Sequence, residues 1–229
     1  MDDQTKPVTE DNGGRKMIFE QIPAGGDRNL AYLIADEDER VGLVVDPSLD
    51  SEELLARILA HGVKIKYIVN THAHADHIAG NALIKQETGA KVVMHSLARA
   101  RHDVSVEDGS VLEVGSLRPR VIHTPGHTPD SLCLLTAGKL VTGDTLFVGK
   151  VGGTDYGEGA RLEYESLNEK LMTLPEETEV WPGHDVGLRL FSTIGQEKKT
   201  NPFILRKSFK DFLELKKNWL EYKKTHGIK

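Results

Sequence analysis

The sequence predicts an α/β fold with mixed β-sheets arranged in two or four layers. In the first half of the chain, short apolar runs typical of strands alternate with segments whose apolar residues recur at helical spacing. In the second half, strand-like runs follow one another closely and are separated by Gly and Pro turns, which is typical of hairpins. This order fits mixed sheets better than a doubly wound parallel sheet.

The first half begins with three expected strands, at 17–22, 29–35 and 41–46. A helix then runs from Ser51 to Gly62, because Leu54, Leu55, Ile58 and Leu59 recur at helical spacing. The next expected elements are a strand at 67–70, a helix at 78–88 that Gly89 ends, and a strand at 91–94.

The second half contains four closely spaced expected strands, at 111–114, 120–123, 132–136 and 140–142. A glycine-rich stretch at 149–159 interrupts this pattern, and a helix at 162–174 and a short strand at 179–181 follow.

Three segments are expected along the chain: a disordered tail at 1–16, a catalytic domain at 17–205 and a C-terminal helix at 206–229. The last is a basic amphipathic helix, in which aromatic residues and leucines alternate with many lysines. The expected role of this helix is to pack its apolar stripe on the domain. The alternatives are a contact between two copies of the chain, as in a homodimer, or a wall that draws an anionic substrate toward the site.

Composition narrows the class of protein. The 229 residues are 38% hydrophobic, which is enough for a proper core, and the net charge of −6 argues against nucleic-acid binding. The single cysteine, Cys133, excludes an internal disulfide framework. The start of the chain lacks the apolar stretch of a signal peptide, and no apolar run is long enough to span a membrane. A soluble cytoplasmic protein without a membrane partner is expected.

The most informative motif is Asn-Thr-His-Ala-His-Ala-Asp-His at residues 70–77, directly after an apolar strand. It places His72, His74, Asp76 and His77 within six residues. Imidazole nitrogen and carboxylate oxygen are the ligands that Zn²⁺, Fe²⁺ and Mn²⁺ prefer. Alternate spacing lets two of these side chains point to one metal while the next pair turns toward another. A solvated polar turn would leave the matching residues downstream unexplained.

Three later turns also place a potential ligand directly after a strand. The first is Thr-Pro-Gly-His-Thr, which carries His127 and ends in Thr128. The second is Thr-Gly-Asp-Thr, which carries Asp144, and the third is Trp-Pro-Gly-His-Asp, which carries His184. In each turn a glycine lets the backbone turn sharply and fixes the side chain that follows. With the octapeptide they supply seven ligands, which is enough for two adjacent metal ions with one bridging carboxylate.

These residues, in this order, resemble the metallo-β-lactamase fold hydrolases over about residues 17–205. The resemblance implies an αββα sandwich of two mixed sheets flanked by helices, with the metal site at one edge. In binuclear members of that family, the first metal would take His72, His74 and His127. The second would take Asp76, His77 and His184, and Asp144 would lie between the two metals.

Departures from the family pattern indicate the subgroup. Asp144 stands where zinc β-lactamases carry cysteine, and His74 stands where flavodiiron oxygen reductases usually carry glutamate. The chain most resembles the glyoxalase II and persulfide dioxygenase group, through Gly-Asp-Thr-Leu-Phe at 143–147 and the segments around Asp155 and Asp185. Two further departures concern glutathione binding. Family members that hold a glutathionyl group commonly have an Arg or Lys that anchors its carboxylate, and Gly153 occupies that position here. Val186 replaces a tyrosine that is frequent in the family.

The substrate is therefore expected to be a different thioester or to be held by other residues. Lys150, Arg161 and the lysines of the tail are candidate anchors, and Tyr156 is a candidate for the pocket wall.

The resemblance implies a thioester hydrolase that acts on hydroxyacylglutathione or a related thiol ester. Two divalent ions (Zn, Fe or Mn) would generate a hydroxide near neutral pH, which attacks the carbonyl, and a thiolate would leave. Asp76 would orient the nucleophile, so Asp76 and Asp144 are the candidate catalytic residues. Thr71, Thr128 and Asp185 are candidates for orienting the histidines.

The alternative is a persulfide dioxygenase with one Fe(II) held by His72, His127 and Asp144, which would oxidise glutathione persulfide or a related persulfide with O₂. A third hypothesis, a metal-stabilised interaction module, is disfavoured because structural zinc sites are usually closed by four ligands, often cysteines.

Overall fold

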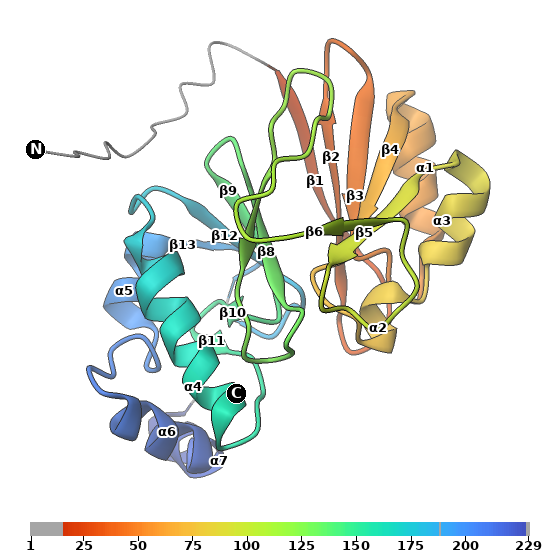
Figure 1. Ribbon diagram of the computed structural model, residues 1–229. Helices are drawn as coiled ribbons and strands as arrows, with labels where there is room; N and C mark the ends of the chain where they lie inside the picture. The colour runs from red at the N-terminus through yellow and green to blue at the C-terminus, as the bar shows by residue number, and fades with distance from the viewer. Residues whose placement is uncertain (1–15, 188, 228–229) are drawn as a thin grey trace, which may run out of the picture.

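Two β-sheets face each other, and helices cover the outer face of each (Figure 1). The protein is represented by a computed structural model that describes residues 16–187 and 189–227. The N-terminal sheet has the order β1-β2-β3-β4-β5-β6, and the C-terminal sheet has the order β13-β12-β9-β8-β7. The predicted α/β class with mixed sheets is confirmed. The predicted tail at 1–16 lies outside the described residues except for Lys16.

The N-terminal sheet starts as an antiparallel meander and continues as parallel strands, from β3 through β6. Its strands are β1 (Met17–Pro23), β2 (Leu30–Asp36), β3 (Val41–Val45), β4 (Lys64–Val69), β5 (Lys91–His95) and β6 (Val104–Val106). The helices on this side of the molecule are α1 (Glu52–His61), α2 (Ala75–Ile78) and α3 (Asn81–Thr88). Helices α1 and α3 pack on the outer face, whereas α2 lies at the lower edge in Figure 1.

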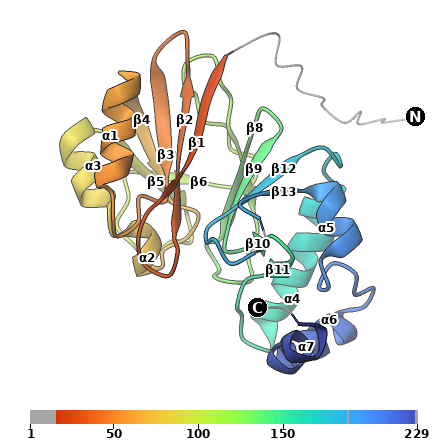
Figure 2. The same ribbon diagram turned by 180° about the vertical axis from the view of Figure 1, so that it is seen from behind.

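In the C-terminal sheet, β8 runs antiparallel to both neighbours and β12 runs parallel to β9. Its strands are β7 (Arg120–His123), β8 (Leu132–Thr136), β9 (Lys139–Gly143), β12 (Glu179–Pro182) and β13 (Ser192–Thr193). A two-stranded ribbon, β10 (Leu146–Phe147) with β11 (Lys150–Val151), stands beside it. Seen from behind, α4 (Glu158–Glu165) and α5 (Ile194–Thr200) lie outside this sheet, with α6 (Phe209–Lys217) and α7 (Trp219–His226) below them (Figure 2).

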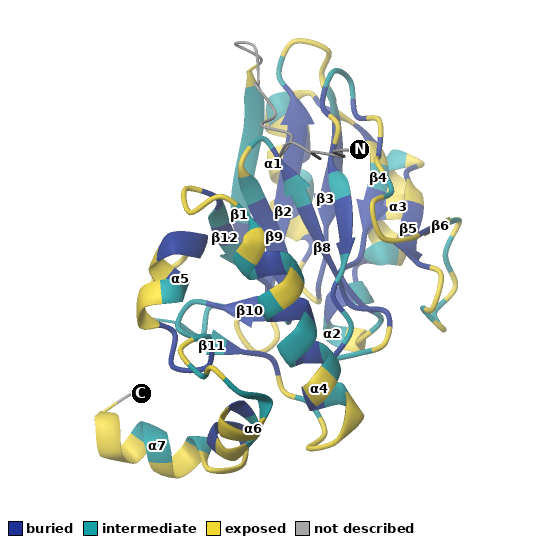
Figure 3. Ribbon diagram, turned by 60° about the vertical axis from the view of Figure 1, so that its left-hand side comes forward, coloured by how far each residue is buried: buried dark blue, intermediate teal, exposed yellow. Residues whose placement is uncertain are grey.

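The core consists of three apolar layers, because the central strands bury both of their faces. In β2, Leu30, Tyr32 and Ile34 pack between the sheets, and Leu33 points to the opposite side, toward α1 and α3. A third cluster, which includes Phe212, lies between the C-terminal sheet and its helices. Each fully buried side chain of this size contributes about 1.5–3 kcal/mol. The resulting pattern of buried strands under exposed outer helix faces is visible in Figure 3.

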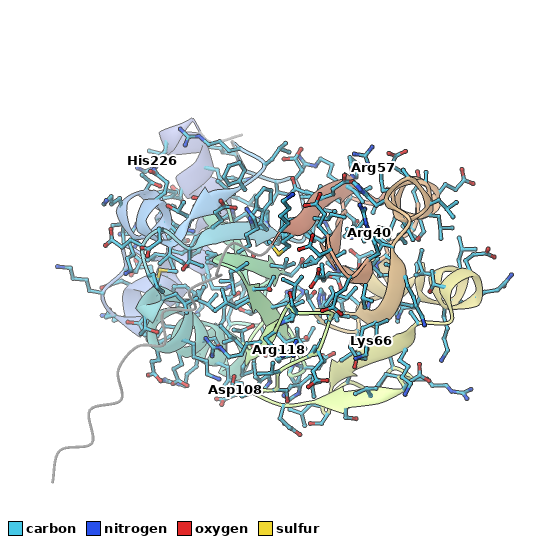
Figure 4. All side chains as sticks on the ribbon, turned by 90° about the horizontal axis from the view of Figure 1, so that it is seen from above. Arg40, Arg57, Lys66, Asp108, Arg118 and His226 are labelled. Atoms are coloured by element: carbon cyan, nitrogen blue, oxygen red, sulfur yellow. The ribbon has the colours of Figure 1, made fainter. Side chains whose placement is uncertain are left out.

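The sandwich has two recognisable halves when it is viewed from above. In Figure 4, Arg40, Arg57 and Lys66 lie on the half that carries the N-terminal sheet, and His226 of α7 lies at the far end of the other half. Within the described residues, no helix is both long enough and apolar enough to cross a membrane.

The predicted helix at 78–88 is wrong as a single element. The structure has α2 before it and α3 within it, and the break falls at Ala79 and Gly80. At Gly80 the chain passes very close to the Pro47 carbonyl, so that a Cβ built there would lie 1.8 Å from that oxygen. A continuous helix with side chains cannot make this approach.

The predicted strand at 111–114 is also wrong. Only isolated bridges occur there, from Val111 to Arg120 and from Val114 to Leu117. Pro119 faces this segment and has no N–H to donate to a ladder. The structure also contains short elements that the sequence pattern did not indicate, namely β6, β10, β11, β13 and α5.

The predicted helix at 162–174 is irregular, and the predicted single helix at 206–229 is two helices. The helix predicted at 162–174 begins earlier, at Glu158, as α4. It continues as a π-helical turn at Ser166–Lys170 and a 3₁₀ turn at Leu171–Thr173. In the tail, Asn218 leaves the helical conformation, and its side chain donates to the Glu214 carbonyl. The break lets Trp219 pack on Phe203, with ring centroids 4.8 Å apart.

Asp36 connects the end of β2 to the turn that precedes β7. Its carboxylate accepts hydrogen bonds from the amides of Asp38, Glu39 and Ser116, at 2.9, 2.9 and 2.7 Å. Burial opposes ionisation of this carboxyl, but the hydrogen bonds outweigh burial and lower the pKa of Asp36 to about 2.

This lowered pKa makes Asp36 a source of stability that acid removes. A folded-state pKa below the unfolded value of about 3.9 stabilises the protein above that pH, and the contribution disappears as the pH falls toward about 2. We expect Asp36→Asn to lower the free energy of unfolding at pH 6, and the difference from wild type to shrink between about pH 4 and pH 2. Urea unfolding at several pH values measures this, with the exposed Asp38→Asn as the control. An equal difference at pH 6 and pH 3 would contradict the assignment.

Candidate metal centre

The seven predicted ligands come from strand ends that meet at one edge of the sandwich. Strand β4 leads into the octapeptide, β7 into the turn with His127, β9 into Asp144 and β12 into His184. Strands β7, β9 and β12 run in the same direction, so their carboxyl ends share one edge of the C-terminal sheet. Backbone hydrogen bonds join the two sheets there, from Leu132 N to Thr71 O and from Leu30 N to Gly183 O. The backbone therefore brings the ligands together.

His72, His74 and His127 form the first group. The Nδ1 of His74 lies 2.9 Å from His72 Nε2 and 3.0 Å from His127 Nε2. Neutral imidazoles cannot satisfy three converging nitrogens with hydrogen bonds alone, because each ring carries one N–H, and two of these rings use their other nitrogen elsewhere. Three nitrogens that face one point fit a bound cation.

Asp76, His77 and His184 form the second group. The Nε2 atoms of the two histidines are 3.2 Å apart, and each lies 3.6 Å from Asp76 Oδ2. His77 is buried at the centre of the site, whereas Asp76 lies closer to the surface.

Asp144 lies between the two groups. Its Oδ1 is 3.4 Å from His77 Nε2 and 3.3 Å from His184 Nε2, and its Oδ2 is 3.6 Å from His127 Nε2. Each carboxylate oxygen thus faces a different group. A third combination, His72 with His77 and Asp144, also brings its donor atoms within 4.8 Å of one another.

The geometry of these donors suits a first-row divalent ion. A metal with bonds of about 2.05 Å to nitrogen separates its ligand atoms by about 2.9 Å at right angles and about 3.4 Å at tetrahedral angles. The nitrogen–nitrogen separations of 2.9–3.2 Å lie within that range, and the 3.6 Å between Asp144 Oδ2 and His127 Nε2 is slightly longer. The buried Asp144 Oδ1 also lacks a hydrogen-bond partner within the described part of the chain, as expected for an atom that a cation would satisfy.

The electrostatics of the site favour a cation beside His77. Burial opposes protonation of this imidazole, but the carboxylates of Asp46 and Asp144 outweigh it and raise the pKa of His77 to about 10. Burial and the neighbouring His77 instead hold the pKa of His72 well below its usual value. Burial opposes ionisation of the Asp144 carboxyl, but His184 and His77 outweigh burial and hold the pKa of Asp144 well below its ordinary range. One positive charge among these anions is stable, whether proton or metal.

Asp46, at the end of β3, organises the centre from behind. Its carboxylate contacts His77 Nδ1 at 2.9 Å and accepts hydrogen bonds from the Thr71 amide and hydroxyl, at 2.8 and 2.6 Å. The Thr71 hydroxyl is in turn 3.1 Å from His72 Nδ1. One buried carboxylate thereby orients a histidine from each group.

Other groups orient the remaining ligands through their outer atoms. The carbonyl of Asp27 lies 2.8 Å from His184 Nδ1, and that of Gly153 lies 2.6 Å from His127 Nδ1. Asn29 Nδ2 donates to Asp76 Oδ2 at 3.0 Å. These contacts leave the Nε2 atoms of His127 and His184 facing the site.

Sequence reasoning expected Thr71 to orient a histidine, and its hydroxyl lies where that role requires. The Thr128 hydroxyl instead pairs with Ser131, and the Asp185 amide donates to the Arg28 carbonyl. Asp46 and Asn29 were missed as site residues. A signal was present for both, because each is a polar residue next to an apolar strand: Asp46 directly follows β3 and Asn29 directly precedes β2.

The candidate substrate residues are dispersed. Lys150 lies in β11, with its ammonium 5.5 Å from the centroid of the Phe147 ring, and that ring is 6.0 Å from His184. Tyr156 is 56% exposed. Arg161 stacks its guanidinium 4.4 Å from the Phe209 ring, on α6. Of the three, Lys150 is the one that the structure connects to the centre.

The fold and the site together define a two-sheet α/β protein with a metal-ligand cluster at one edge. The chain belongs to the Metallo-beta-lactamase superfamily, whose family model matches residues 24–184.

The relatives of this chain among known proteins include persulfide dioxygenases and hydroxyacylglutathione hydrolases. The chain is 33% identical over 192 residues to human mitochondrial persulfide dioxygenase ETHE1, an alignment that covers 82% of this chain and 74% of the human protein. It is 39% identical over 177 residues to a hydroxyacylglutathione hydrolase of Polaromonas sp. (strain JS666), covering 74% and 67% of the two chains. The crystal structure of ETHE1 from Myxococcus xanthus superposes with a TM-score of 0.83 at 36% identity, covering 89% of this chain and 91% of that one.

The role of Asp46 leads to a specific prediction. We expect Asp46→Asn to weaken metal binding about 10- to 100-fold, because the amide no longer supplies the charge that orients His77 and Thr71. Competition with a chromophoric chelator measures the affinity, and the exposed Asp50→Asn is the matched control. Wild-type affinity in Asp46→Asn would exclude this orienting role.

Proposed function

We propose that this protein is a metal-dependent thioester hydrolase of the glyoxalase II type, with two divalent ions at the edge of the sandwich. The observation that carries the proposal is that the second ligand group is oriented as thoroughly as the first. Asp46, the Asp27 carbonyl and Asn29 each hold one of its members, His77, His184 and Asp76 respectively. A centre that used a single metal at the first group would gain nothing from the contacts of the Asp27 carbonyl and Asn29.

When bound, two divalent ions would lower the pKa of a shared water toward about 7 and polarise the thioester carbonyl. The chain itself would supply the orientation. Burial opposes ionisation of Asp76, but the hydrogen bond from Asn29 and the neighbouring His77 lower its pKa, so the carboxylate stays anionic. It would accept a hydrogen bond from the attacking water and fix its direction. The thiolate leaves without strong acid assistance, because a thiol pKa is near 8.5.

Lys150 is the proposed anchor for an anionic thiol carrier. Its side chain is half-buried, and within the described residues no carboxylate forms a salt bridge with it. Burial and the charge of Lys223 on α7 lower its pKa. An ammonium that is partly desolvated beside a like charge favours an anion, and a carboxylate of the carrier would fill that role. Tyr156 is proposed to line the pocket, and Arg161 is the less favoured anchor because it stacks on Phe209.

A second candidate function is a persulfide dioxygenase with one Fe(II) at His72, His127 and Asp144. The specific observation in its favour is the match to the Myxococcus xanthus structure, which extends over about nine tenths of both chains. The hydroxyacylglutathione hydrolase alignment leaves about a third of that enzyme unmatched. Two imidazoles and one carboxylate would leave open positions for O₂ and substrate.

Metal content and two assays distinguish these functions. For the hydrolase we expect close to two Zn, Fe or Mn ions per chain after anaerobic purification, and turnover of hydroxyacylglutathione thioesters without O₂. Asp144→Ala should reduce that turnover at least about 100-fold, because loss of a ligand that stabilises developing charge costs several kcal/mol. One Fe per chain, with O₂ consumption on addition of glutathione persulfide, would replace the hydrolase proposal with the dioxygenase.

The substrate anchor is tested separately. We expect Lys150→Ala to raise KM for an anionic thioester about tenfold with little change in kcat, since a hydrogen bond to a charged group contributes about 1.5–3 kcal/mol. The exposed Lys210→Ala should leave both constants unchanged. A neutral thioester substrate should show no difference between Lys150→Ala and wild type. If KM rose equally for both substrates, Lys150 would not be a charge anchor.

A further inference from the structure

A buried ion pair joins the C-terminal segment to α4. Lys216 of α6 and Glu163 of α4 form a salt bridge, and their side chains are only 5% and 0% exposed. Burial raises the pKa of Glu163 to about 7 and lowers the pKa of Lys216, so each charge depends on the other.

Packing alone does not require this ion pair. The desolvation penalty of a buried pair often equals or exceeds its Coulomb gain, and apolar residues of the same size are frequently as stable. Helix α6 already buries Phe212 and Leu215 against the core. A third apolar residue at position 216 would hold the helix in place. The presence of a buried charged pair at this position therefore needs an explanation other than packing.

The ammonium makes a second contact, with the segment that holds a metal-site histidine. Lys216 Nζ donates to the Gly152 carbonyl at 2.7 Å, and the next carbonyl, that of Gly153, accepts from His127 Nδ1 at 2.6 Å. The same segment lies against the other side of the centre. A Cβ built on Gly152 would lie 1.9 Å from the Asp144 carbonyl oxygen and 3.2 Å from Glu163 Oε1.

Helix α4 contacts the His127 turn as well. A Cβ on Gly126 would lie 2.4–2.5 Å from Glu163 backbone and Cβ atoms, and Ser166 Oγ donates to the Pro125 carbonyl at 2.8 Å. The turn before His127 and the carbonyl that accepts from its ring are thus both set by the elements that carry the ion pair.

We propose that Lys216 and Glu163 are positioning residues for the metal centre. The pair fixes the Gly152–Gly153 segment, and the Gly153 carbonyl then sets the direction in which His127 presents Nε2 to the metal. The C-terminal segment in this way contributes to the site without touching metal or substrate. The inference rests on metal binding by His127 in the proposed function, but it holds for either reaction.

The test is metal affinity in Lys216→Met, which keeps most of the side-chain length and removes the charge and the donor. Co²⁺ serves as the probe, because its visible spectrum reports ligand geometry and chelator competition gives its affinity. We expect Lys216→Met to bind Co²⁺ about 10- to 100-fold more weakly than wild type, with an altered spectrum. Thermal unfolding of the metal-free protein measures the loss of stability separately.

Two controls separate positioning from stability. Lys217→Met makes the same change at the exposed neighbouring position, and Leu215→Ala loosens the same helix at a buried apolar position. Both should keep Co²⁺ affinity within about twofold of wild type, even where Leu215→Ala lowers the Tm as much as Lys216→Met does. Wild-type affinity and spectrum in a destabilised Lys216→Met would overturn the inference, as would equal losses in Leu215→Ala.

A second variant covers failure of Lys216→Met to fold. Glu163→Gln keeps the volume and one acceptor for the ammonium, and it should weaken Co²⁺ binding in the same direction by a smaller factor. Unchanged affinity in this variant would overturn the inference. Absence of Co²⁺ binding by the wild-type protein would contradict the proposed function itself, which distinguishes the two failures.

Discussion

The structure depends on one electrostatic constraint at the edge of the sandwich, where donor atoms from seven side chains lie within a few ångströms of one another. Nitrogens and carboxylate oxygens that converge at separations of 2.9–3.6 Å repel one another through their lone pairs, and a cation among them removes this repulsion. The rest of the molecule can be understood as the scaffold that keeps them there. Parallel strand ends bring the ligands to one edge, and buried polar groups such as Asp46 fix their directions.

The groups that orient the site come from parts of the chain that are farther from the octapeptide as their distance from the site increases. The octapeptide supplies four candidate ligands from the loop after β4 and the start of α2. The inner layer of orienting groups comes from residues next to neighbouring strands, such as Asp46 after β3 and Asn29 before β2. The outer layer, Lys216 with Glu163, comes from the C-terminal segment and α4. Mutations remote from the chemistry can therefore act on the centre through a chain of backbone carbonyls.

The α/β class and the convergence of the seven side chains could be predicted from sequence, because both follow from local patterns. A ligand after a strand, fixed by Gly or Pro, is visible in a few consecutive residues, as at His127 and His184. The break at Gly80 and the absence of a strand at 111–114 could not be predicted, since they depend on contacts with Pro47 and Pro119. The Lys216–Glu163 pair joins residues 53 positions apart, and a lysine in a basic helix gives no local sign of burial.

The bridge between Asn29 and His184 has a consequence for the order of events during synthesis. This contact joins the residue before β2 of the first sheet to the turn after β12 of the second. A nascent chain that has emerged only through β8 carries His72, His74, Asp76, His77 and His127 but neither Asp144 nor His184. Such an intermediate presents five of the candidate ligands, but it lacks the Asp144 carboxylate between the two groups and the closed edge. All seven donor side chains therefore come together only after β12 has paired with β9.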